Sequence, residues 1–261
     1  MWKIGRCTEI EVVGATGIMS TVWMVSRGAM CVLLLAAAQF CSACRPSVEP
    51  IEVAYGCPGQ PLRGPESYEN ELADQLIDDF ESGDNYLPIP PVEGRDGFWV
   101  LGSDSTAGAL IDEVVSHCVA RGKWSGHFAA RGFTSWGNNW TAVFRAPANA
   151  YAVPYDGSKY SAISFWAAFG ADNGPAFEVP MGLTTMDNAW NGKVCTVCMD
   201  FYAAKVPLSH DWQRFVIRFD QMAQSGTGIP QVPMRRDQLV GFIIYPRQQF
   251  DIWIDDVRFE P

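Results

Sequence analysis

The chain has 261 residues, of which 48% are hydrophobic and 13% aromatic, and its formal net charge is −10. A chain of this length can form one large domain or two small ones, and its apolar side chains suffice for a sizeable core. Binding to a phosphate backbone needs clustered lysine and arginine side chains, and this acidic sequence contains no basic stripe. Nucleic acid is therefore excluded as a partner.

The N-terminal region contains a pattern typical of an export signal. A short stretch with Arg27 precedes an apolar run over 30–40, and small residues follow that run. A basic segment, an apolar segment and a small-residue cleavage site together are the features of a secretory signal peptide. The apolar run is shorter than the ~20 residues that a membrane-spanning helix needs. We therefore expect an exported protein.

The end of this signal allows two interpretations. Residues Cys41-Ser42-Ala43-Cys44 resemble a lipobox, the motif of bacterial lipoproteins in which the last cysteine is lipidated and becomes the mature N-terminus. Cys41 stands where the family pattern prefers leucine, whereas Ser42 and Ala43 fit. The resemblance implies lipidation of Cys44, a membrane contact through the lipid anchor alone, and a place in the bacterial envelope at the outer membrane. Cleavage after Ala43 would instead release a secreted protein.

The sequence divides into three parts on this interpretation. Residues 1–43 form the leader, and Met24 is the predicted true start, because the acidic residues before it do not fit the basic segment of a signal peptide. Residues 44–75 contain the candidate anchor and a proline-rich linker, which would hold the protein clear of the membrane. Residues 76–261 form the folded domain.

The cysteines outside the leader and the anchor are candidates for disulfides. An exported compartment favours oxidation, and four cysteines allow three pairings. A bridge between Cys195 and Cys198 would close a short loop, and one between Cys57 and Cys118 would tie the N-terminal segment to the domain. The two-residue spacing of Cys195 and Cys198 also suits a zinc site, but the sequence has no second pair of this kind. Zinc is therefore the disfavoured alternative.

From residue 76 onward, short apolar stretches alternate with turn clusters rich in glycine, asparagine and aspartate. Aromatic and β-branched residues fill the apolar stretches, as is typical of strands. Neither a long amphipathic helix nor an internal repeat is visible. Many short strands with glycine-rich turns favour a sandwich or a barrel. The expected strands span 76–81, 98–101, 126–133, 140–145, 162–169, 177–183, 199–202, 212–219, 240–245 and 250–259.

Three blocks of this domain resemble a known family. The first is LIDDFE over 76–81, the second is YSAISFW over 160–166 with DWQRF over 211–215, and the third is FDIWIDDVRF over 250–259. In this order they are similar to the galactose-binding-like jelly rolls, which include carbohydrate-binding modules of exported glycosidases and the CIA30-like domains. The likeness covers residues 76–261. It implies an all-β fold in which two antiparallel sheets form a β-sandwich.

The resemblance also implies a structural calcium ion, because many of these modules hold one where the first and last strands meet. Calcium takes about six to eight oxygen ligands, and carboxylates from both ends of the domain would pin the sandwich closed. Asp255 shares a strand face with apolar residues, so its carboxylate must be hydrogen-bonded, ion-paired or metal-bound. Backbone amides or an arginine are the alternative partners. The acidic candidates for calcium are Asp79, Glu81, Asp255 and Asp256.

Three polar clusters carry an aromatic residue beside amides or carboxylates. Sugars stack their apolar faces on exposed aromatic rings, while a few polar groups fix the orientation of a ligand. Tryptophans inside predicted strands, namely Trp99, Trp166, Trp212 and Trp253, are instead expected in the core. The predicted ligand-binding residues are Trp136, Asn138, Asn139, Trp140, Tyr155, Asp187 and Trp190.

The sequence contains no nucleophile elbow, P-loop, zinc-protease or kinase motif. We therefore expect a non-catalytic, monomeric binding module for a carbohydrate, tethered at the cell envelope and holding a structural calcium ion. A structural or protein-interaction lipoprotein is the first alternative, since one fold serves many purposes. A polysaccharide-cleaving enzyme is the second alternative, and it would need two carboxylates at a suitable separation.

Overall fold

The computed structural model describes residues 73–261, apart from 89, 107–108, 117, 148–152, 171–176 and 247–248. The predicted leader, the lipobox with Cys44 and the segment with Cys57 lie outside the described residues. Among the described residues, no helix is long and apolar enough to cross a membrane.

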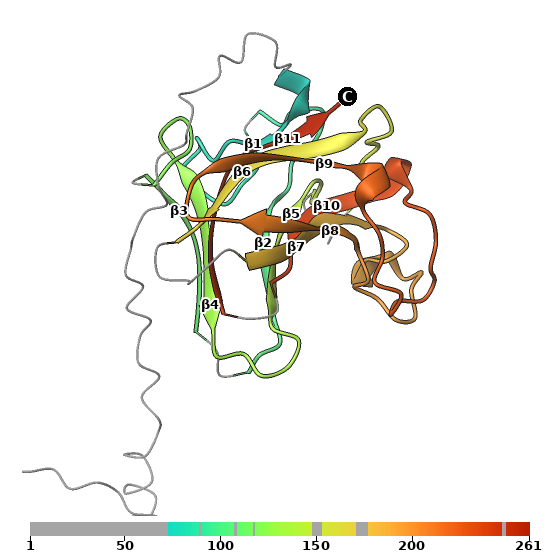
Figure 1. The fold of residues 1–261 in the computed structure, drawn as a ribbon. Helices are drawn as coiled ribbons and strands as arrows, with labels where there is room; N and C mark the ends of the chain where they lie inside the picture. The colour runs from blue at the N-terminus through green and yellow to red at the C-terminus, as the bar shows by residue number, and fades with distance from the viewer. Residues whose placement is uncertain are drawn as a thin grey trace, which may run out of the picture. The chain divides into compact units, whose positions relative to one another are not determined.

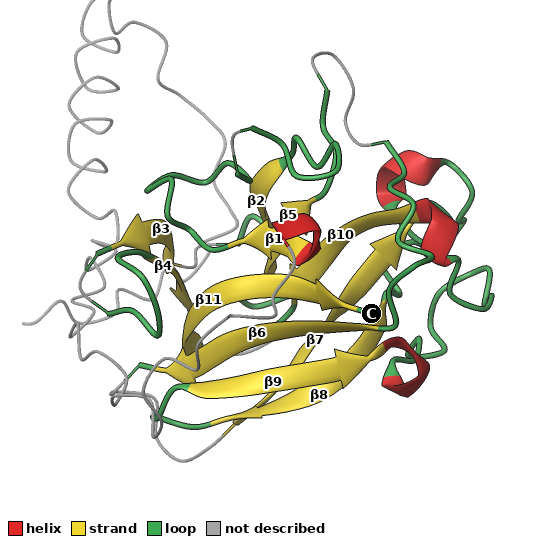
Figure 2. Ribbon diagram, turned by 90° about the horizontal axis from the view of Figure 1, so that it is seen from above, coloured by secondary structure: helices red, strands yellow, loops and turns green. Residues whose placement is uncertain are grey.

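Two antiparallel sheets face each other and confirm the expected β-sandwich (Figures 1 and 2). The six-stranded sheet has the order β3-β4-β11-β6-β9, with β1 also paired to β11; the other has the order β2-β5-β10-β7-β8. The first sheet contains β1 (Leu76–Asp78), β3 (Ala109–Val115), β4 (Ser125–Arg131), β6 (Ala162–Phe169), β9 (Gln213–Arg218) and β11 (Phe250–Glu260). The second contains β2 (Phe98–Ser103), β5 (Asn138–Val143), β7 (Phe177–Thr185), β8 (Tyr202–Leu208) and β10 (Leu239–Ile244).

Short 3₁₀ turns accompany the strands. They are η2 (Ala73–Gln75), η3 (Trp190–Gly192), η4 (Phe219–Gln221) and η5 (Arg236–Gln238). η2 leads directly into β1, and η4 directly follows β9.

The main core lies between the sheets and follows the two-residue period of the strands. In β9, Phe215 and Ile217 pack toward the core while Arg214 and Val216 are exposed, as the alternation predicts. In the central strand β6, every residue is buried. Such a strand is covered on both faces, which explains why its sequence is apolar or small throughout.

A second apolar cluster covers the opposite face of the six-stranded sheet. It contains Trp166, Trp212 and Trp253, so these tryptophans are buried as expected, but away from the main core. The His127 ring stacks on Trp253 with centroids 4.0 Å apart. This cluster explains how both faces of β11 can be buried.

Two strands differ from the sequence prediction. β3 was not expected, because Asp112 and Glu113 interrupt its apolar pattern; β3 is an edge strand, where such side chains reach solvent. β8 spans Tyr202–Leu208 rather than 199–202. β8 contains Pro207, which it tolerates because it is also an edge strand.

The side chain of Arg95 is fully buried and bonds three separate parts of the chain. Its Nη2 atom donates to the carbonyl oxygens of Asp74 and Leu76, both at 2.6 Å, and its Nη1 atom donates to the Tyr155 hydroxyl. The guanidinium carbon also lies 5.5 Å from the centroid of the Phe259 ring. Arg95 therefore connects η2, β1, the loop with Tyr155 and β11.

We predict that Arg95→Gln lowers the free energy of unfolding by about 2–4 kcal/mol, because the shorter side chain leaves buried carbonyl groups without donors. Urea unfolding followed by tryptophan fluorescence measures this change. The control is Arg235→Gln, since Arg235 is half-exposed in an ion pair with Asp237 and should cost less than about 0.5 kcal/mol. Equal costs for the two variants would contradict the role of Arg95.

Candidate functional site

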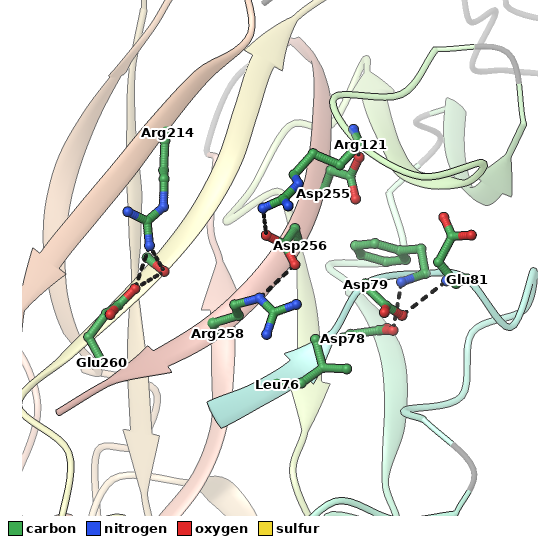
Figure 3. A network of polar contacts seen from close by, with 12 residues as sticks. Leu76, Asp78, Asp79, Glu81, Arg121, Arg214, Asp255, Asp256, Arg258 and Glu260 are labelled. Atoms are coloured by element: carbon green, nitrogen blue, oxygen red, sulfur yellow. Dashed lines mark hydrogen bonds and ion pairs between the residues drawn. The ribbon is translucent and has the colours of Figure 1, made fainter. Parts of the chain in front are cut away.

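The first and last strands meet with Leu76 of β1 opposite Arg258 of β11. Beside this pairing, four carboxylates and two guanidinium groups line a hollow of about 310 Å³ (Figure 3). The structure thus brings together all the residues that the sequence predicted to bind calcium. The carboxylates are those of Asp79, Glu81, Asp255 and Asp256, and the guanidinium groups are those of Arg121 and Arg258.

A β-bulge explains why two successive acids of β11 reach the same hollow. In a regular strand, Asp255 and Asp256 would point to opposite faces. The pairing of β11 with β6 shifts register between Asp255 and Arg258, and Asp256 has a φ of 50°. A bulge of this kind bends the strand and redirects a side chain. Asp256 accepts a hydrogen bond from Arg121 Nη1 at 3.2 Å and another from Arg258 Nε at 2.7 Å.

Asp255 is only 1% exposed, and only one of its two carboxylate oxygens is hydrogen-bonded. Oδ2 accepts hydrogen bonds from the backbone N–H groups of Ala120 at 3.0 Å and Arg121 at 2.9 Å, which confirms that Asp255 bonds backbone amides. Oδ1 is buried without a hydrogen bond. Burial, and next the nearby charge of Asp256, raise the pKa of Asp255 to about 8 against these hydrogen bonds.

Glu81 and Asp79 enter the hollow from the segment after β1. Glu81 Oε1 accepts hydrogen bonds from the backbone N–H groups of Lys123 at 2.6 Å and Trp124 at 3.0 Å. Gly122 allows this approach, since a Cβ atom there would lie 2.1 Å from Glu81 Oε1. Burial, followed by the charge of Glu81, raises the pKa of Asp79. The hollow therefore crowds carboxylates that repel one another.

Some features of the hollow suit a hard cation such as calcium, and others oppose it. The donors are oxygens, as calcium requires, and the unbonded Oδ1 of Asp255 lacks a partner. Arg121 and Arg258, however, already neutralise Asp256. Within the described part of the chain, no group of three or more His, Cys, Asp or Glu residues is arranged to hold a metal ion. Calcium stays a prediction.

The cysteine pair near residue 200 is oxidised. Cys195 and Cys198 form the expected disulfide, so their sulfurs are bonded to each other rather than available to zinc. Cys118 is buried and also disulfide-bonded, whereas Cys57 lies outside the described residues.

Four of the predicted ligand-binding residues are buried in the sandwich. Trp140 is 0% exposed and packs against Trp99 with ring centroids 4.3 Å apart, and Tyr155 accepts the hydrogen bond from Arg95. Asn138 and Asn139 are also buried, because β5 begins at Asn138 where the sequence indicated a loop. These four side chains therefore cannot form a surface contact with a sugar.

A fifth predicted residue, Asp187, is also buried at 9% exposure, with Oδ1 3.8 Å from Arg235 Nη1. The other two are exposed, Trp136 at 43% and Trp190 at 79%. Trp136 and Trp190 lie in different loops, one before β5 and one after β7.

Three aromatic residues follow one another near the end of β10: Trp136 is 43% exposed, Tyr245 is partly buried and Phe201 is 7% exposed. Tyr245 Oη donates a hydrogen bond to the Trp136 carbonyl oxygen at 3.2 Å, and the Tyr245 ring lies 5.3 Å from the Phe201 ring. Because Ile244 points into the core, the alternation of β10 turns Tyr245 outward. We call Trp136, Tyr245 and Phe201 the aromatic row. Tyr245 was not among the predicted binding residues, although it ends the strand expected over 240–245.

The outer face of the five-stranded sheet carries small and polar residues. Gly182 and Ala203 lie opposite each other on β7 and β8, and Gly182 also lies opposite Ile243 of β10. Farther along these strands, the exposed side chains of Lys205 and Glu178 form an ion pair at 3.4 Å. At the centre of the face Gly182 and Ile243 are buried and Ala203 is partly buried, so the exposed groups lie at its sides, with the ion pair of Lys205 and Glu178 at one of them.

Neither a family model nor a curated protein matches the chain. Among solved structures, the chain is similar to a family 11 carbohydrate-binding module from Clostridium thermocellum in complex with a β-1,3-1,4-mixed-linked tetrasaccharide. The identity is 16%, the match covers 71% of this chain and 94% of that chain, and the TM-score is 0.49.

The chain is also similar to a family 30 carbohydrate-binding module of a cellulosomal cellulase from the same organism. There the identity is 13%, the match covers 62% of this chain and 90% of that chain, and the TM-score is 0.42. A xylan-binding domain of Paenibacillus barcinonensis gives 13% identity, 62% and 84% coverage and a TM-score of 0.38. The ligands in these descriptions are those of the proteins named, and the ligand of this chain stays open.

We predict that Asp255→Asn flattens the pH dependence of stability. The folded state holds a proton on Asp255 that the unfolded chain, with a pKa near 3.8, releases. The free energy of unfolding therefore falls as the pH rises from about 4 to about 8. Part of this fall remains in the variant, because burial also raises the pKa of Asp78 to about 8.

Melting temperatures at pH 5 and pH 8 measure this effect. The exposed Asp211, changed to Asn, serves as the control and should keep the pH dependence of the unmodified protein. An unchanged pH dependence in Asp255→Asn would show that this carboxylate is ionised in the folded state.

Proposed function

We propose that the chain is a non-catalytic, monomeric binding module that takes a polysaccharide on the outer face of its five-stranded sheet. The observation that supports this function is the aromatic row. Most tryptophans in the described residues are buried, whereas Trp136 is held in solvent at the end of this row. A large ring kept at the surface by a packed support is typical of a binding surface.

The row and its neighbours supply both kinds of contact that a sugar needs. Aromatic rings offer a flat apolar surface at little cost in conformational entropy, and they suit the C–H face of a pyranose ring. The partly buried Thr141 and the ion pair of Lys205 with Glu178 offer donors and acceptors to hydroxyl groups. With the net charge of −10, a neutral polysaccharide is favoured over an acidic one.

The proposal includes the tether expected from the sequence. A lipid on Cys44 and the linker over 44–75 would place the module at the outer membrane, where it would meet polysaccharide outside the cell. Polysaccharide cleavage remains the alternative activity.

We predict that Trp136→Ala weakens polysaccharide binding by roughly 5- to 30-fold, about 1–2 kcal/mol, because a stacking surface is lost. Affinity gel electrophoresis with barley β-glucan, xylan and dextran measures retention. The control is Val216→Ala, since Val216 is an exposed apolar residue on the other sheet.

Two outcomes would contradict this function. One is the absence of retention by every polysaccharide of a broad panel. The other is release of reducing ends from a retained polysaccharide, which would show that the protein is an enzyme.

We further propose that calcium binds in the hollow between β1 and β11. The residues that would hold it are Asp79, Glu81 and Asp255, and the bound ion would supply the positive charge that offsets their mutual repulsion. The unbonded Oδ1 of Asp255 supports this assignment.

Millimolar calcium should therefore raise the melting temperature by several degrees, since binding to the folded state alone stabilises it. EDTA should remove the gain, and Asp79→Asn should reduce it. Magnesium at the same concentration is the control, because it is smaller and gives up its water with difficulty. Equal melting temperatures in calcium and in EDTA would rule the site out.

A further inference from the structure

Two loops beside β8, over 186–200 and 224–231, form a surface feature that we call the stapled lobe. It holds most of the large apolar side chains that are exposed in the described residues. Trp190 stands out among them with 79% exposure. The exposed apolar residues of the lobe are Trp190, Val194, Val197, Met199 and Ile229.

Covalent and hydrogen bonds hold the lobe in place. The disulfide between Cys195 and Cys198 closes the first loop, and Val197 and Ile229 form an antiparallel bridge between the two loops. The Asn188 side chain accepts a hydrogen bond from the Thr185 backbone and donates one to the Asp200 carbonyl oxygen. Trp190 is therefore displayed by a fixed support, which lowers the entropy lost when a ligand binds.

Asp200 joins the second loop to the first. Its carboxylate accepts hydrogen bonds from the backbone of Ser225 at 2.7 Å and Gly228 at 2.8 Å, and from Gln231 Nε2 at 2.8 Å. Burial alone would raise the pKa of Asp200, but these hydrogen bonds outweigh burial and lower the pKa to about 2. The carboxylate thus stays charged, and it holds the loop at any physiological pH.

The aromatic row leads from Trp136 to this lobe. Phe201, at the far end of the row, directly follows Asp200 in the chain. The segments that carry the two exposed indoles meet opposite ends of β10. The Trp136 carbonyl oxygen accepts a hydrogen bond from Tyr245, after the last residue of the strand, while the N–H of Met186, four residues before Trp190, donates to the Gln238 carbonyl oxygen before its first. A six-residue strand is about 20 Å long. One sugar ring cannot contact both indoles.

We propose that Trp190 forms a second contact for the polysaccharide that binds along the aromatic row. The ligand is then a long chain held along its length, rather than a short oligosaccharide or a chain end. The inference rests on the proposed function and adds the ligand's length to it. The half-exposed aliphatic residues around Trp190 offer apolar contact without hydrogen-bonding groups, so this contact adds affinity and leaves recognition of the sugar to the row.

The energetic consequence is a preference for polymer. Once the row has bound one stretch of the chain, the next stretch reaches Trp190 at a high effective concentration. A disaccharide seated on Trp136 is shorter than β10 and cannot reach Trp190 as well. The polymer should therefore bind more tightly than the disaccharide, and Trp190 should account for part of the difference.

The experiment compares Trp136→Ala, Trp190→Ala and the unmodified protein on two probes, barley β-glucan and the disaccharide cellobiose, by isothermal titration calorimetry. If the first screen retains another polysaccharide, that polysaccharide and its own disaccharide replace them. Trp190→Ala should weaken polymer binding roughly 5- to 30-fold and leave disaccharide binding unchanged. Trp136→Ala should weaken both. The matched control is Ile229→Ala, an exposed apolar change within the lobe that removes no ring.

Unchanged polymer binding in Trp190→Ala, with Trp136→Ala impaired, would overturn the inference and leave the proposed function intact. Failure of the unmodified protein to bind any polysaccharide would instead overturn the proposed function. Loss of self-association in Trp190→Ala by analytical ultracentrifugation, with polymer binding unchanged, would make the lobe a protein interface and overturn the inference. Equal melting temperatures would show that each variant is folded.

Discussion

The fold depends on a buried guanidinium group that holds the two ends of the domain together. Arg95 donates to carbonyl oxygens of η2 and β1 and lies beside the ring of Phe259 in the last strand. Hydrogen bonds of this kind are strengthened by the low dielectric of the interior, and their loss there is costly. Tyr160 donates to the same Asp74 carbonyl oxygen and stacks on Phe259, so the contact extends into the loop before β6.

The position of β1 has chemical consequences at the edge of the sandwich. Because β1 pairs with β11 only over a few residues, the chain leaves the sheet at Asp79 and Glu81 beside the bulge that turns Asp256 into the hollow. The crowded carboxylates therefore result from how the domain is closed. Arg121 and Arg258 offset part of their charge, and burial, followed by the remaining repulsion, raises the pKa of Asp79 and Asp255.

The apolar and alternating patterns of the sequence correctly predicted the strands whose burial depends only on which of their faces are covered. The apolar run of β6 gave its bounds without error, and the alternation of β9 gave the correct faces, because each depends on which sides of a strand are covered. The four acids of the hollow were also predicted, since the resemblance placed them at the two ends of the domain.

Trp140 and Tyr155 were misplaced because a polar, glycine-rich neighbourhood indicated loops, whereas pairing between strands and burial around Arg95 decide where they lie. Tyr245 could be assigned to a face only once its partners across the sheet were known.

The stapled lobe is held by bonds that lie within it or at its junction with the sheet. The disulfide, the bridge between its loops and the bonds of Asp200 constrain it locally, and Trp190 itself makes little contact with the core. A segment built in this way can change its exposed tip without altering the packing of the sheets beneath it. Variation at positions such as 190, 194 and 197 would thus let related chains diverge in what they hold while the sandwich stays the same.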